Sequence, residues 1–136
     1  MAAPVARATV RWIGDLRFEG GVEGRPFVEI DGNSKTATSP VEMLLVSAAT
    51  CAASDVVIIL KRQRVELTSF EIAVRGTRRE ENPRRYTAMH LVCTFRGAGL
   101  DEPKARRAVA LSIEKYCSVI SSLNPDIPVT YDIVIA

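Results

Sequence analysis

Residues 39–64 read SPVEMLLVSAATCAASDVVIILKRQR and contain the longest apolar run of the chain. Ser39 is a preferred N-cap residue, Pro40 suits the first helical position, and Glu42 follows the serine by three residues. This capping box predicts a helix that begins there and runs to about Arg64. The middle of the segment is apolar nearly all round and rich in small residues, so we expect the helix to be buried on every side.

The length of the chain, 136 residues, is that of one domain of roughly 100–150 residues. We therefore expect a single domain over residues 1–136. A chain of this size buries only about two thirds of its unfolded surface. Because it would struggle to surround an all-apolar helix alone, the sequence favours a homodimer.

The composition is that of an ordinary soluble protein, with 47% hydrophobic and 25% charged residues. The 18 Lys and Arg residues nearly balance 16 Asp and Glu, for a net charge of +2, so bulk charge predicts neither a nucleic-acid nor a membrane partner. The first residues lack the apolar core of a signal peptide, and Asp55 would be costly in a membrane-spanning helix. These features predict a cytoplasmic protein with reduced thiols.

The other elements follow from apolar alternation and from turn residues. Three short strands near the N-terminus, a hairpin, a second helix and a closing strand are predicted, and the order indicates an α+β fold. Their expected ranges are 8–13, 16–19 and 27–30 for the short strands, 69–80 and 84–96 for the hairpin, 101–124 for the second helix and 129–135 for the last strand.

Three cysteines and one histidine bear on the chemistry. Because no CxxC or Cys/His cluster exists, we expect no zinc site and no other cofactor. Cys51 lies mid-helix among small residues, where it is either a small core residue or a reactive thiol with space beside its sulfur. Asp55, one turn later, is a carboxylate in need of a partner. Cys117, on the second helix, is likewise either a core residue or a reactive thiol. Cys93 alternates with apolar residues on a strand and is predicted to lie in the core.

The remaining polar candidates are less specific. Arginines cluster at the hairpin tip without the interleaved aromatics of an RNA-binding surface, so a solvated rim is favoured over nucleic-acid binding. His90 stands alone on a strand and is interpreted as structural. Arg17 and Arg25 lie in the N-terminal strand and loop region, where either could face a site.

Two motifs carry a resemblance to a known family. Residues 39–45, SPVEMLL, followed by AATC at 48–51, resemble the first cysteine helix of the OsmC/Ohr family. Residues 114–119, EKYCSV, resemble its second cysteine motif in the form seen in the YhfA-like branch. The resemblance extends over about residues 11–135.

This resemblance implies an OsmC-like fold: an intertwined homodimer with two long central helices wrapped by antiparallel sheets. It also implies a thiol peroxidase for organic hydroperoxides that uses no metal or haem. Cys51 would be the nucleophile and Cys117 the resolving thiol, and a dithiol reductant of lipoyl or thioredoxin type would reopen their disulfide.

The sequence departs from the family pattern at the thiolate partner. The peroxidase branches pair an N-terminal arginine with an acid that directly follows the proline, and here that position is Val41. Arg17 is the first candidate for the arginine, Arg25 the second, and Glu42 the candidate acid, although Glu42 also fits the capping box. The departure leaves open an alternative, a non-catalytic binding or redox-sensing dimer with a small apolar pocket near Cys51.

Overall fold

The computed structural model describes residues 3–136. The chain forms two compact units, one ending at Leu44 and the other spanning Leu45–Ala136, and each is described by itself. The single domain expected over residues 1–136 stays a prediction.

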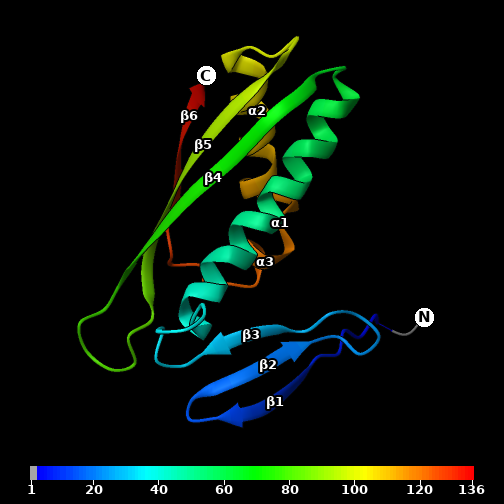
Figure 1. Ribbon diagram of the computed structural model, residues 1–136. Helices are drawn as coiled ribbons and strands as arrows, with labels where there is room; N and C mark the ends of the chain where they lie inside the picture. Colours follow the sequence, from blue (N-terminus) through cyan, green and yellow to red (C-terminus); the bar gives the residue numbers. More distant parts are fainter. Residues whose placement is uncertain (1–2) are drawn as a thin grey trace. The chain divides into compact units, whose positions relative to one another are not determined.

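The first unit is built on an antiparallel sheet of three strands in the order β1–β2–β3 (Figure 1). The three short strands expected near the N-terminus are confirmed. Their bounds are β1 Thr9–Gly14, β2 Arg17–Gly21 and β3 Val28–Asp31.

The loop after β3 is organised by one carboxylate. Asp31 is 3% exposed and accepts hydrogen bonds from the backbone N–H groups of Thr36 (3.0 Å), Asn33 (2.9 Å) and Lys35 (3.2 Å). These bonds, that from Thr36 foremost, hold the pKa of Asp31 at about 2, because they stabilise the ionised form.

The long helix α1, Pro40–Arg62, begins with the predicted capping box. The Ser39 N–H donates to Glu42 Oε1 (2.9 Å), and the Glu42 N–H donates to Ser39 Oγ (3.2 Å). Two N–H groups that would lack partners at a helix start are thereby satisfied. The helix ends two residues before the predicted Arg64.

The second unit contains a mixed sheet in the order β4–β5–β6. Strands β4, Glu66–Arg78, and β5, Tyr86–Ala98, form the predicted antiparallel hairpin. Strand β6, Val129–Ile135, pairs with β5 in parallel, so the expectation of purely antiparallel sheets was wrong for this pair. The chain crosses over between β5 and β6 through a helical segment, as a parallel pair requires.

The predicted second helix is interrupted. Helix α2, Glu102–Leu111, is capped by the Asp101 carboxylate, which accepts from the Lys104 N–H. It passes into a π-helical turn at Ser112–Tyr116, the backbone extends at Cys117 (φ −71°, ψ 108°), and a short helix α3 follows at Ser118–Ser121. The continuous helix predicted for 101–124 was therefore wrong in its second half, because a π turn takes one extra residue.

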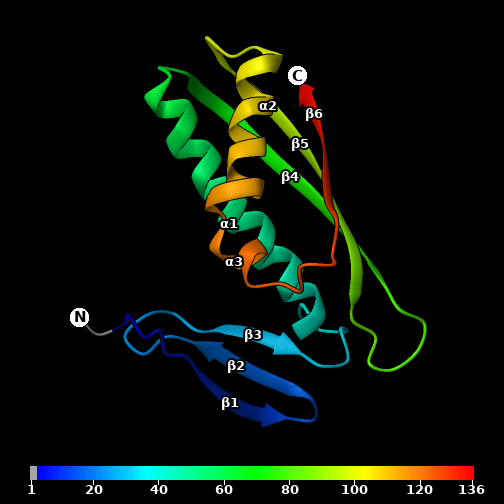
Figure 2. The same cartoon turned by 180° about the vertical axis from the view of Figure 1, so that it is seen from behind.

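Helices α1 and α2 lie on the same face of the β4–β5–β6 sheet (Figures 1 and 2). The core fills the space between them, with Val56 and Leu60 from α1, Leu91 and Phe95 from β5 and Val109 from α2 all buried. Phe95 also stacks on Phe70 of β4, with ring centroids 4.5 Å apart.

Within one chain, helix α1 is not buried on every side, so its complete burial, which the sequence predicts for a homodimer, stays a prediction. Val46, Val57 and Ile58 remain exposed by 47%, 43% and 50%. Helix α1 is also long and apolar enough to cross a membrane. This is weak evidence for a membrane-spanning helix, because the core helix of a soluble protein can have the same length and composition.

Candidate functional site

The second unit brings Cys51 and Cys117 together. Cys51 lies on α1 and is half-buried, whereas Cys117 follows the π turn and is 2% exposed. Both are free thiols, and Cys51 lies close enough to Cys117 to raise the pKa of the Cys117 thiol. Cys117 Sγ also lies 3.9 Å from the Ala48 carbonyl, one turn before Cys51.

Burial keeps Cys117 protonated. The pKa of this thiol is raised to about 11, mainly by burial, and the neighbouring Cys51 side chain acts in the same direction. The N–H of Ile120, which donates to Cys117 Sγ at 3.4 Å, acts in the opposite direction. Cys117 is thus both the residue that ends the π turn and the N-cap residue of α3, and it is a neutral thiol at physiological pH.

Asp55 has a hydrogen-bond partner that could not be identified from the sequence. Ser112, which is fully buried at the start of the π turn, donates its hydroxyl to Asp55 Oδ2 at 2.8 Å. The same hydroxyl lies 3.2 Å from the Ala52 carbonyl. No local pattern in the sequence points to Ser112 as the partner, because 57 residues separate the pair. The only available signal was the unpaired acid in an apolar helix.

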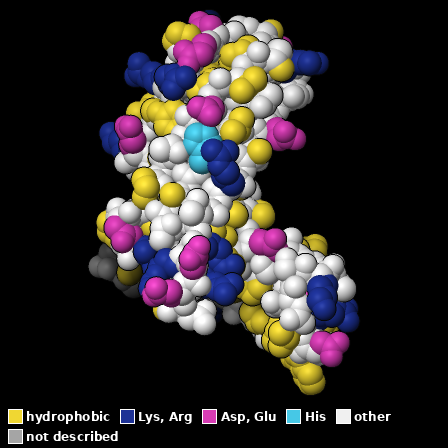
Figure 3. All heavy atoms as spheres, turned by 90° about the vertical axis from the view of Figure 1, so that its left-hand side faces the viewer, with side chains coloured by type: hydrophobic (Ala, Val, Ile, Leu, Met, Phe, Trp, Pro, Cys, Tyr) yellow, Lys and Arg dark blue, Asp and Glu magenta, His cyan; other side chains and the backbone are white. Residues whose placement is uncertain are grey.

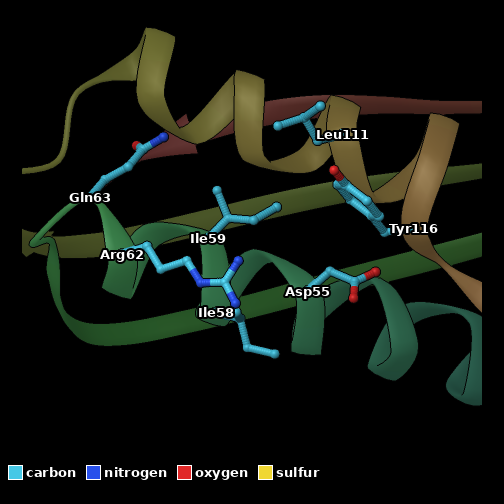
Figure 4. Close-up of a pocket in the computed structure, with 7 residues that line it drawn as sticks. All are labelled: Asp55, Ile58, Ile59, Arg62, Gln63, Leu111 and Tyr116. Atoms are coloured by element: carbon cyan, nitrogen blue, oxygen red, sulfur yellow. The ribbon is translucent and has the colours of Figure 1, made fainter.

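A hollow of about 490 Å³ lies beside this pair (Figure 4). It is lined by both polar and apolar side chains, and the small apolar pocket near Cys51 stays a prediction. The lining residues are Asp55, Ile58, Ile59, Arg62, Gln63, Leu111 and Tyr116. Gln63 Oε1 is buried and lacks a hydrogen-bond partner within the described part of the chain. The hollow offers an apolar wall together with a carboxylate, a guanidinium, an amide and a phenol.

The arginine and the acid named from the resemblance lie in the first unit. Arg17 pairs with Glu29 Oε1 at 2.7 Å, and this hydrogen bond raises the pKa of Arg17 and lowers that of Glu29. Glu29 is therefore an acid that orients Arg17, and it was not among the residues predicted from the sequence. The diagonal register could have found it, because Arg17 pairs with Asp31 and Glu29 is two residues away on the same face.

Glu42 and Arg25 are placed differently. The Glu42 carboxylate accepts from the Ser34 hydroxyl and from the Ser39 N–H, and these bonds lower its pKa. Arg25 is exposed, in the loop between β2 and β3. The active-site roles of Arg17, Arg25 and Glu42 stay predictions.

Cys93 and His90, which were interpreted as structural, are buried or bonded to a neighbouring strand. Cys93 is fully buried, as predicted, and burial raises its pKa to about 11. The His90 ring, visible at the surface in Figure 3, lies 2.6 Å from Thr130 Oγ1 and 3.0 Å from Asp132 Oδ2, both on β6.

Several hairpin arginines are engaged in local contacts, which fits a solvated rim. Arg78 donates to the Arg84 carbonyl, Arg79 pairs with Glu81, and Arg85 pairs with Asp126 at 2.6 Å. Over residues 3–136, no three side chains from histidine, cysteine, aspartate and glutamate gather as a metal-binding group.

Comparison with known proteins gives a consistent result. The family model for "OsmC-like protein" matches residues 32–132. Protein YhfA of Escherichia coli K12 is 39% identical over 133 residues, covering 96% of this chain and 99% of YhfA. A hypothetical protein from Aquifex aeolicus is 26% identical with a TM-score of 0.84, covering 98% of this chain and 99% of the other. The organic hydroperoxide resistance protein OhrB of Bacillus subtilis shares the fold at 18% identity and a TM-score of 0.63, covering 97% and 99% of the two chains. The chain belongs to the OsmC-like protein family.

Proposed function

We propose that this protein is a thiol peroxidase that reduces organic hydroperoxides with Cys51 and Cys117. The observation that carries the proposal is the pairing of a half-buried thiol with a buried one on two different elements of the second unit. The half-buried Cys51 sulfur is accessible to a substrate, whereas the buried Cys117 sulfur is accessible only to Cys51 beside it. A relative of the same fold is named for organic hydroperoxide resistance.

The chemistry takes two steps. Cys51 sulfur attacks the distal oxygen of the hydroperoxide, the O–O bond breaks, and the alcohol leaves, so the peroxide is reduced and Cys51 becomes a sulfenic acid. Cys117 sulfur then attacks the sulfenic sulfur. The S–S bond forms, the S–O bond breaks, and the hydroxyl leaves as water with the thiol proton. A dithiol of lipoyl or thioredoxin type then reduces the disulfide back to two thiols.

The raised pKa of Cys117 supports this division of roles. A thiol that titrates at about 11 is a poor nucleophile toward peroxide at neutral pH, because the thiolate is the reactive form. The Cys117 thiol reacts efficiently only with a sulfur atom held beside it, because proximity compensates for its low intrinsic reactivity. The guanidinium of Arg17, oriented by Glu29, is our candidate for holding Cys51 as thiolate.

The proposal includes the assembly and the compartment. We infer a cytoplasmic homodimer in which the exposed apolar residues of α1 are covered by a second copy. Thr50 and Ser54 support a helix–helix contact there, because their hydroxyls donate back to the carbonyls of Val46 and Thr50. The exposed face of α1 therefore offers small side chains whose hydroxyl donors are already satisfied.

A second candidate function is a binding or redox-sensing protein without turnover. The hollow beside Asp55 favours it, because an apolar wall with a few convergent polar groups is the usual form of a ligand pocket. In this case Cys51 would oxidise slowly and an organic ligand would occupy the hollow.

The test is to mix the reduced protein with cumene hydroperoxide, follow peroxide loss, and map the cysteines by non-reducing peptide mass spectrometry. We expect stoichiometric peroxide loss with a Cys51–Cys117 disulfide. Cys51→Ser should abolish the loss, and Cys117→Ser should leave a sulfenic acid that dimedone traps. Cys93→Ala is the matched control and should react like the wild type. Unchanged peroxide loss in Cys51→Ser would refute the proposal.

A further inference from the structure

Ser112 is tied to its surroundings at two atoms. Its hydroxyl donates to Asp55 Oδ2 at 2.8 Å and lies 3.2 Å from the Ala52 carbonyl, so its side chain is anchored on α1. Its own carbonyl accepts the N–H of Cys117 at 2.8 Å. One fully buried residue therefore connects the α1 helix to the backbone of the cysteine.

The π turn between Ser112 and Cys117 gives this connection its importance. A π turn holds an extra residue, is rare in proteins and occurs frequently at functional sites. It determines where the chain leaves the helix and hence where Cys117 lies. A polar group buried in the core is costly unless it is paired, and the acid and the hydroxyl satisfy each other in this arrangement. The turn is thereby fixed to α1 by a hydrogen bond as well as by apolar packing.

The contacts with α1 run along one side of the helix. Cys117 Sγ lies beside the Ala48 carbonyl, and the Ser112 hydroxyl bonds to Asp55, seven residues further along α1. Cys51 lies between these two anchor points in sequence. Contacts at both ends define how the π turn lies along α1 and thus the separation between the two sulfurs.

We infer that Asp55 and Ser112 are positioning residues that hold Cys117 at the distance and angle needed to form a disulfide with Cys51. This inference rests on the proposed function of the two cysteines. Disulfides form only within narrow limits, with Cα atoms less than about 7 Å apart and Cβ atoms about 3.5–4.5 Å apart. Loss of the hydrogen bond lets the π turn shift along α1 and slows the step in which Cys117 attacks the Cys51 sulfenic acid.

The experiment separates the two chemical steps. Reduced protein is mixed with one equivalent of cumene hydroperoxide, peroxide loss reports the first step, and acid-quenched mass spectrometry reports the disulfide. In Ser112→Ala and Asp55→Ala, we expect peroxide loss within about twofold of wild type and disulfide formation slowed about 10- to 100-fold. Dimedone-trapped Cys51 should accumulate in these variants.

Two further variants distinguish positioning from general damage. Asp55→Asn keeps an oxygen that accepts the Ser112 hydroxyl and should restore a rate near that of wild type. Ser122→Ala removes a hydroxyl that bonds only to the Ser118 carbonyl of its own turn and should change neither step. Disulfide formation at the wild-type rate in both alanine variants, or equal slowing of both steps, would overturn the inference.

A readout without peroxide keeps the inference separate from the proposed function. The effective concentration of Cys51 for Cys117 is measured by equilibration with oxidised and reduced dithiothreitol. We expect it to fall about 10-fold or more in Ser112→Ala and Asp55→Ala and to recover in Asp55→Asn. If the wild-type protein does not react with peroxide but the variants show these changes in effective concentration, the proposed function fails and the positioning role stands. An unchanged effective concentration would refute the positioning role.

Discussion

At the residue scale, two carboxylates illustrate different uses of one chemical group. Asp31 is ionised and satisfied by three backbone N–H groups, so it organises a loop. Asp55 receives a buried hydroxyl from a distant element, so it joins two parts of the core. The sequence marked Asp55 as an acid that needs a partner. Identifying Ser112 required the tertiary structure.

Asp31 should make the stability of the first unit depend on acid pH. Its folded pKa of about 2 lies below the ordinary value of 3.8. Its contribution is therefore fully present above about pH 4 and is lost as the pH falls toward 2. We expect Asp31→Asn to lower stability at pH 7 and to flatten the pH dependence between 4 and 2, measured by urea unfolding at each pH. A parallel loss of stability in both proteins over that range would contradict this assignment.

At the element scale, local sequence patterns predicted those features that depend on neighbouring residues alone, such as helix starts and strands. The capping box predicted the start of α1, and period-two alternation predicted the strands. Alternation is the same in parallel and antiparallel pairs, so the direction of β6 could not be read from it. The π turn escaped prediction for a related reason. Residues 102–121 keep helical composition, and the contacts between the π turn and α1 join residues far apart in the sequence.

The β4–β5 pair contains a position that only glycine can occupy. A Cβ atom at Gly97 would lie 2.5 Å from the Glu66 carbonyl oxygen and 3.0 Å from Leu67 Cα. Because these are backbone atoms of the neighbouring strand, they cannot move aside without opening the ladder. We expect Gly97→Ala to destabilise the protein by about 1–3 kcal/mol, measured by urea unfolding. The adjacent exposed Ala98→Ser serves as the control and should have little effect.

At the scale of the whole molecule, the exposed apolar face of α1 is the surface that the proposed homodimer would cover. A single chain leaves Val46, Val57 and Ile58 in solvent, and the removal of such a surface from water is a main driving force for association. The sequence predicted that α1 needs more cover than 136 residues supply. Which residues stay uncovered depends on how α2 and the sheet pack, and this became visible only in the structure.

Charge on this face should disrupt the proposed dimer. We expect Val57→Glu to shift the protein from dimer to monomer in size-exclusion chromatography with light scattering, because a buried unpaired carboxylate is costly. Ala98→Glu introduces the same charge at an exposed strand end and should leave the dimer intact. A Val57→Glu protein that stays dimeric would place the interface elsewhere.

The parallel alignment of β6 with β5 also has a kinetic consequence. Met89 and Val129, which face each other in this ladder, are 40 residues apart in sequence (89 to 129), whereas β4 and β5 are joined by a short hairpin. Closing the longer loop costs more chain entropy before any contact compensates for it. We expect the hairpin to be structured in the folding transition state and β6 to dock late, with φ-values near zero along β6.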